Sequence, residues 1–161
     1  MTRFTFIFML ATVFAAACPS SAFPAEPADP LLGTWQLNVH KSTFEPAPGP
    51  KGQLRTYAQS GDAEKLTAQG ISADGKPTLV EYTARYDGKD YAITGSSGGD
   101  LISLKRIDAH TTESTQKRAG MPAIITTRTV SEDGKTLTVT TKGTSAQGVT
   151  LNHKMVFDRR R

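Results

Sequence analysis

Alternating apolar and polar residues, interrupted by Asp-Gly-Lys tripeptides, constrain this sequence more than any other feature. From Val80 to Tyr86 an apolar or aromatic residue takes every second position, which predicts a half-buried strand. The tripeptide occurs three times, at 74–76, 87–89 and 133–135. Aspartate and glycine tolerate the positive φ that tight turns require, so each tripeptide predicts a hairpin between neighbouring antiparallel strands.

The same pattern extends over most of the chain and predicts about ten strands. Near the start, Leu31, Gly33, Trp35, Leu37 and Val39 share one face. The predicted strands are 31–39, 54–58, 66–70, 80–86, 91–94, 101–107, 110–118, 123–130, 136–142 and 149–158. Three prolines favour a loop over 40–51. We therefore expect an all-β, antiparallel up-and-down meander that closes into a barrel, or else a strongly curved, partly open sheet.

The first 22 residues are typical of a signal peptide. Arg3 precedes an uncharged, apolar run from Phe4 to Ala17, and small residues around Ala22 provide a cleavage site. We expect a flexible, proline-containing leader over 23–30 and a single all-β domain over 31–161. The protein is therefore expected to be periplasmic or secreted.

Cys18 leaves a second interpretation open, because a cysteine after small residues resembles a bacterial lipoprotein site. Ala15 and Pro19 depart from that pattern, so plain cleavage is the preferred expectation, and membrane association is expected only if Cys18 is lipidated. Cys18 is the only cysteine, so no disulfides are expected. Basic residues are scattered apart from 159–161, and no nucleic-acid partner is predicted.

No group of side chains has the spacing that catalysis or metal binding needs. The three histidines are His40, His110 and His153, and none lies in a zinc-ligand motif. Asp108 and His110 could share a strand face, but no nucleophile motif accompanies them. We expect no catalytic residue, no metal and no cofactor, and hence no enzyme.

The segment His110 to Arg118 carries no aliphatic or aromatic side chain on either face. Polar groups buried in an apolar core are costly, so this strand is predicted to lie at a sheet edge or to line a solvated cavity. In the cavity case the inward residues are either Thr112, Ser114 and Gln116 or Thr111, Glu113 and Thr115. The sequence does not choose between these faces.

The motif Gly33-Thr34-Trp35-Gln36-Leu37 resembles the first strand of lipocalins and fatty-acid-binding proteins, the calycin superfamily. The ending 156–159 resembles the last strand of the fatty-acid-binding group, and 33–44 also resembles the opening of uncharacterised exported bacterial β-proteins. The resemblance implies that Trp35 plugs one end of a barrel beneath a cation from Arg159 or Arg160.

Two features depart from the fatty-acid-binding pattern. That group has a helix pair after the first strand, where this chain has the proline-rich loop. Many members also bind a carboxylate through Arg-x-Tyr on the last strand, where the aligned residues here are Met155 and Phe157. The resemblance therefore supports the fold more than a fatty-acid ligand.

We expect a lipocalin-like binding protein for a small hydrophobic or amphipathic ligand. The candidate ligand contacts combine aromatic side chains with a few polar groups. They are Trp35, Tyr57, Tyr82, Tyr91, Ser114, His153, Met155 and Phe157. The alternative is an envelope structural or interaction protein that pairs with another chain through an exposed strand edge.

Overall fold

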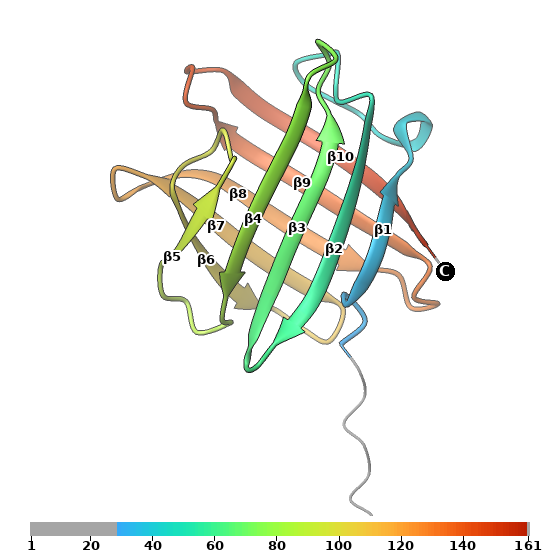
Figure 1. Cartoon of the computed structure of the whole chain (residues 1–161), viewed down its shortest axis with the longest axis vertical. Coiled ribbons are helices and arrows are strands. Elements are labelled where there is room, and N and C mark those ends of the chain that lie inside the picture. The colour runs from blue at the N-terminus through green and yellow to red at the C-terminus, as the bar shows by residue number, and fades with distance from the viewer. Residues whose placement is uncertain (1–28, 161) are drawn as a thin grey trace, which may run out of the picture.

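The computed structural model describes residues 29–160 and shows a closed antiparallel barrel of ten strands. The expected signal peptide, including Cys18, and most of the expected leader lie outside the described residues. The strands are β1 (Gly33–Leu37), β2 (Gly52–Ser60), β3 (Ala63–Ile71), β4 (Pro77–Ala84), β5 (Tyr91–Thr94), β6 (Leu101–Arg106), β7 (Thr111–Arg118), β8 (Met121–Val130), β9 (Thr136–Thr144) and β10 (Thr150–Arg159). Figure 1 shows β2, β3 and β4 crossing over the strands of the opposite wall.

Each strand pairs with its neighbours along the chain, and β1 closes the barrel by pairing with β10. This confirms the closed barrel and overturns the open-sheet alternative. All ten strands are paired on both sides, β7 included. The expectation of an exposed strand edge at 110–118 is therefore wrong, because sheet closure gives every strand two partners.

The three Asp-Gly-Lys tripeptides connect β3 to β4, β4 to β5 and β8 to β9, as predicted. Gly75, Gly88 and Gly134 have φ values of 88°, 72° and 68°, which lie in the region that glycine adopts at least cost. In two of these turns a serine hydroxyl also donates to the aspartate, Ser72 to Asp74 and Ser131 to Asp133. Local turn chemistry therefore fixes three of the hairpins.

The first strand is shorter than the alternation indicated. It ends at Leu37, and Val39 begins a short 3₁₀ helix, η1 (Val39–Lys41), where it is exposed. The Asn38 side chain accepts a hydrogen bond from the Lys41 amide and so caps this turn. The prediction that Val39 continues the strand is therefore wrong. Val149, expected on the inward face, is likewise exposed and precedes β10.

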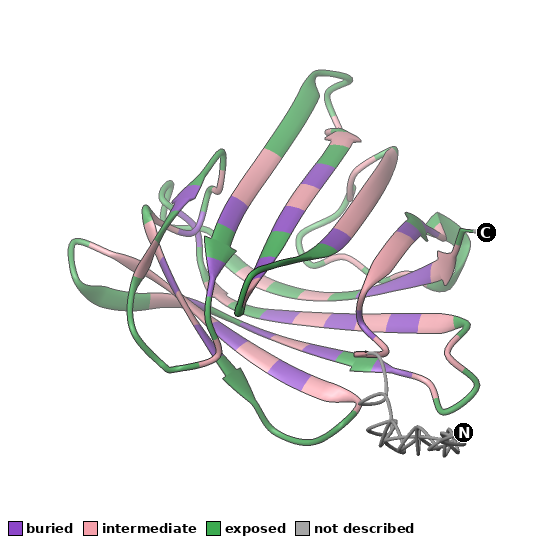
Figure 2. Cartoon of the chain, turned by 60° about the horizontal axis from the view of Figure 1, so that its bottom comes forward, coloured by how far each residue is buried: buried purple, intermediate pink, exposed green. Residues whose placement is uncertain are grey.

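Burial follows the two-residue period of the strands, as Figure 2 shows in alternating bands along them. The core cluster includes Trp35, Leu104, Leu137, Val139 and Phe157, all fully buried. Asp29 and Pro30, the last residues of the expected leader, contact the barrel through Arg106 and Arg159. In the described residues, no helix has the length and apolarity needed to cross a membrane.

Candidate functional site

Trp35 closes one end of the barrel, and its environment explains the Gly-x-Trp motif. Its indole N–H donates to the Leu31 carbonyl at 2.9 Å, and the Arg159 guanidinium lies 4.1 Å from the ring centroid. Of the two arginines that the resemblance offered as the cation over Trp35, Arg159 and Arg160, the structure places Arg159 there. Gly33 has a φ of 125°, and a Cβ there would lie 2.7 Å from Arg159 Nη1. Glycine is thus needed for the guanidinium to reach the tryptophan.

Arg159 also joins segments that are far apart in the sequence. Its Nε donates to the Gly134 carbonyl at 2.5 Å, and its Nη1 donates to the Leu32 carbonyl at 2.8 Å. The same side chain thus holds the entry to β1, the β8–β9 turn and the Trp35 plug. These contacts make this end of the barrel a structural plug, and Trp35 does not line the cavity described below.

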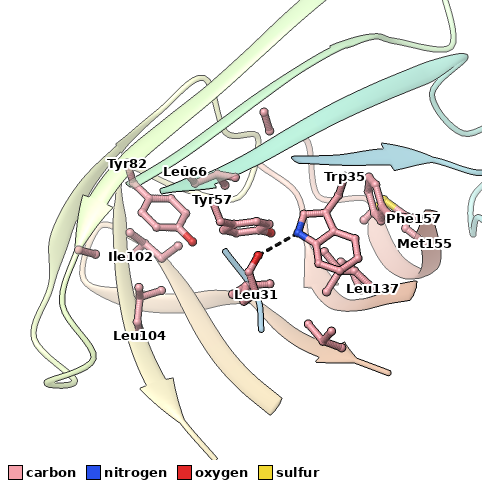
Figure 3. Packing of buried hydrophobic residues seen from close by; sticks show 14 of the residues in the cluster. Leu31, Trp35, Tyr57, Leu66, Tyr82, Ile102, Leu104, Leu137, Met155 and Phe157 are labelled. Carbon is pink, nitrogen blue, oxygen red and sulfur yellow. Dashed lines mark hydrogen bonds between the residues drawn. The ribbon is translucent and has the colours of Figure 1, made fainter. Parts of the chain in front are cut away.

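A cavity of about 500 Å³ occupies the remainder of the interior. Its walls are aliphatic and aromatic side chains from nearly every strand, among them Leu66, Ile93, Ile102 and Ile124. Pro46, Pro48 and Pro50 of the loop after η1 lie at its mouth, together with the 95–97 loop. Figure 3 shows Tyr57, Tyr82, Leu66 and Ile102 close to one another in the interior, and Met155 beside Phe157. The dimensions and mixed lining suit a small organic molecule.

The eight predicted contact residues divide between the cavity and the rest of the core. Tyr57, Tyr82, Ser114, His153 and Met155 line the cavity. Trp35 and Phe157 are fully buried in the plug end instead. The Tyr91 hydroxyl donates to the Asp87 carboxylate at 2.8 Å, and its side chain does not line the cavity. The structure thus brings five of the eight together.

The polar strand β7 faces the cavity with Ser114 and Gln116, which chooses between the two faces that the sequence left open. Thr112, on the same face, is buried, and its hydroxyl has no hydrogen-bond partner within residues 29–160. Across the sheet, Thr126 and Thr141 share a hydrogen bond at 3.2 Å in the cavity wall. Hydroxyl and amide groups on three neighbouring strands therefore give one wall polar character.

A buried charge cluster lies beneath the cavity, and the sequence analysis missed it. Arg128 Nη1 on β8 donates to Glu64 on β3 at 2.8 Å, with side-chain exposures of 2% and 3%. The Tyr82 hydroxyl donates to Glu64 at 2.5 Å, and the Tyr86 hydroxyl donates to the second carboxylate oxygen. Arg128 lies on the same period-two face as Ile124 and Val130, so a charge within an apolar alternation was the available signal.

This cluster shifts the pKa values of its members. Burial raises the pKa of the Tyr82 and Tyr86 hydroxyls well above the usual range, so both stay protonated donors. Burial by itself lowers the pKa of Arg128, but the oxygens of Tyr82 and Glu64 outweigh it, and the pKa is raised. Among the described residues, Arg128 Nε and Nη2 have no hydrogen-bond partner, and the centroid of the Tyr57 ring lies 5.4 Å from Arg128 Cζ.

The structure also places Arg55, which the sequence analysis did not nominate, in the cavity lining. Gln53, Arg55 and Tyr57 alternate along β2 with the outward residues Leu54 and Thr56, so the side chain of Arg55 faces inward. Its Nε donates to Gln53 Oε1 at 2.8 Å, and its Cζ lies 5.0 Å from the centroid of the Phe157 ring.

The proline-rich loop at the mouth of the cavity is attached to β10. Thr43 forms a β-bridge with Lys154, and the Glu45 amide donates to His153 Nδ1 at 3.2 Å. The Phe44 and His153 rings pack edge to face with centroids 5.7 Å apart. Burial lowers the pKa of His153, although the Glu45 carboxylate opposes this shift. Neutral His153 thus holds the loop over the mouth as a hydrogen-bond acceptor.

Over residues 29–160, no three His, Cys, Asp or Glu side chains are grouped so as to hold a metal ion. His110 and Asp108 lie at the β6–β7 turn, where Asp108 accepts hydrogen bonds from the His110 and Thr111 amides. Asp108 thus stabilises the turn. The described residues therefore form a barrel with an internal cavity.

The zebrafish ileal bile acid-binding protein complexed with cholic acid is similar to this chain, with a TM-score of 0.49 and 13% sequence identity. The match covers 81% of this chain and 99% of that chain. No protein-family model matches the chain, and no curated protein matches it.

Proposed function

We propose that this protein is a binding protein that takes up one small, partly apolar molecule in the barrel interior. The observation that carries the proposal is the cavity of about 500 Å³, a size within the range of about 300–1,000 Å³ found for ligand pockets. Its apolar lining favours uptake of hydrocarbon, and Ser114, Gln116 and Thr126 offer polar groups that orient a ligand. Catalysis is not part of the proposal.

We also propose that the protein acts outside the cytoplasm. The charged start, the apolar run over 4–17 and the small residues before Phe23 support export. Native mass spectrometry of the protein from the periplasm of an expressing bacterium examines both proposals at once. A chain beginning at Phe23 is expected for plain cleavage, and a lipid-modified chain beginning at Cys18 for tethering. A bound small molecule is expected in addition to the chain mass.

A titration with octanol tests the cavity directly. Octanol is expected to bind the purified barrel, and Ala68→Phe is expected to abolish binding because the new ring enters the cavity that Ala68 lines. Ala58→Phe on the neighbouring strand is the matched control, since Ala58 is exposed on the outer face. Calorimetry measures both affinities. If octanol does not bind the unmodified protein and native spectra show only the bare chain, the proposal is wrong.

A further inference from the structure

The cavity lining contains cationic side chains but no carboxylate. Among the described residues that line it, Arg55 and Arg128 are the arginines, and neither aspartate nor glutamate is present. His153 also lines it, but burial lowers the pKa of this side chain, so it is neutral at pH 7. The net charge of the cavity therefore depends on whether each of the two arginines has a counter-ion.

Arg128 already has its counter-ion. Its Nη1 contacts Glu64 at 2.8 Å in a fully buried pair just behind the lining. The Glu64 carboxylate accepts hydrogen bonds from Tyr82 and Tyr86 in addition to its contact with Arg128. Arg128 and Glu64 together contribute no net charge to the compartment.

Arg55 has no such partner in the described part of the chain. It forms no salt bridge there, and its hydrogen bonds go to neutral groups, the Gln53 amide oxygen at 2.8 Å and the Tyr57 hydroxyl at 3.5 Å. No hydrogen bond within residues 29–160 uses its Nη2. Arg55 is half-buried and faces the cavity, so an anion bound there would add the charge-assisted hydrogen bonds that its neutral partners do not supply.

The position of Arg55 gives this cation a specific place in the barrel. Its guanidinium lies against the Phe157 ring, so a cation from β2 covers the stretch of β10 that carries Met155 and Phe157. Those two residues offer no donor to an anion. The hydrocarbon wall formed by Leu66, Ile93 and Ile102 lines the same cavity.

We propose that the ligand carries one anionic head group, and that Arg55 binds this group through a charge-assisted hydrogen bond while the apolar part lies along the hydrocarbon wall. This inference rests on the proposed function, because it names the chemical class of the molecule in the same cavity. The recognised chemistry is an oxyanion at one end of a small apolar body. Carboxylates and sulfate esters both meet this description.

The test compares octanoate, octyl sulfate and octanol, which share one hydrocarbon chain and differ in the head group. Calorimetric titrations at neutral pH use the unmodified protein, Arg55→Gln and Arg55→Lys. Losing one charge-assisted hydrogen bond is expected to weaken octanoate and octyl sulfate binding about tenfold or more in Arg55→Gln. Octanol affinity is expected to stay unchanged, which also shows that the variant is folded. Arg55→Lys is expected to retain part of the anion preference because the charge remains.

Arg85→Gln is the matched control, since Arg85 pairs with Asp62 on the exterior and should leave all three affinities unchanged. If the unmodified protein binds octanol as well as octanoate, or if Arg55→Gln keeps its preference for anions, the inference about Arg55 is wrong while the binding function stands. If none of the three probes binds the unmodified protein, the proposed function itself fails. The two failures are therefore distinguishable.

Discussion

At the scale of single residues, the Arg128–Glu64 pair shows how this barrel tolerates charge in its core. Both side chains are almost fully buried, and each is tied to tyrosine oxygens as well as to the other. Taking two charges out of water is costly, and hydrogen bonds that satisfy the remaining lone pairs offset that cost. The network also joins β3, β4 and β8, which lie on opposite walls of the barrel.

Removing one member of this pair should destabilise the protein strongly. Arg128→Met is expected to lower the free energy of unfolding by about 3–5 kcal/mol, because Glu64 then remains buried without its counter-ion. The double variant Arg128→Met with Glu64→Gln is expected to recover part of that loss. Urea denaturation measures all three proteins.

Arg85→Met is the control for that experiment, because the Arg85–Asp62 pair is exposed. Exposed ion pairs contribute about 0–1 kcal/mol, so a small change is expected. A single Arg128→Met variant that is as stable as the Arg85→Met variant would show that the buried pair does not stabilise the barrel.

At the scale of elements, the proline-rich loop is held in position by contacts with β10 and not by regular secondary structure of its own. Asn152 donates its side-chain amide to the Glu45 carboxylate at 2.7 Å, and His153 accepts from the Glu45 amide. Phe44 packs against His153 and against Gly49, where a Cβ would overlap its ring. Side-chain and backbone contacts with β10 therefore hold the loop at the mouth of the cavity.

This attachment should depend on pH through His153. Burial lowers the pKa of His153 in the folded protein below its usual value of about 6.5. The folded state then binds fewer protons than the unfolded state, so the stabilisation is complete above about pH 6.5 and is lost as the pH falls below it. Protonation also turns the Nδ1 acceptor into a donor that faces the Glu45 N–H.

The melting temperature should therefore fall between about pH 8 and about pH 5 more steeply in the unmodified protein than in His153→Gln. Glutamine keeps a hydrogen-bond acceptor but does not titrate. His40→Gln, a change at an exposed histidine of η1, should leave the pH profile as it is. Identical pH profiles for the unmodified protein and His153→Gln would refute this role.

At the scale of the whole molecule, neighbouring strands of the barrel are paired over unequal lengths. β2 pairs with β3 from Gly52↔Ile71 to Ser60↔Ala63, and β9 pairs with β10 over a similar length. The short strand β5 pairs with β4 and with β6 through two residue pairs each. The wall at β5 is therefore held by few ladder hydrogen bonds, and local opening there costs least.

Amide hydrogen exchange should reveal this asymmetry. The amides of Tyr91–Thr94 are expected to exchange faster than those of β3 and β9, because opening β5 breaks few hydrogen bonds and exposes little of the core. Mass spectrometry of peptides from the exchanged protein measures the rates. Equal protection of β5 and β3 would contradict the expectation.

The strands and three of the turns could be predicted from the sequence, because both depend on local properties. Period-two alternation reflects the pleat of a strand, and Asp-Gly-Lys supplies the positive φ of a hairpin. The resemblance of the Trp35 motif to a known first strand also predicted that an arginine covers the tryptophan ring. Where alternation extended past the folded strand, at Val39, a side-chain cap from Asn38 decided the outcome.

Which polar residues share the interior depends on long-range contacts in the folded barrel. Arg55, Arg128 and Glu64 lie on different strands. Whether each arginine has a counter-ion therefore depends on distances between strands, which a local sequence pattern does not contain. The inward face of β7 was likewise set by its pairing with β6 and β8, since either face of that strand is equally polar. Closure itself requires β1 to meet β10 across the length of the domain. Such long-range pairing depends on the register of the whole sheet. Local sequence patterns therefore do not reveal the cavity, or that Arg55 lacks a counter-ion within residues 29–160.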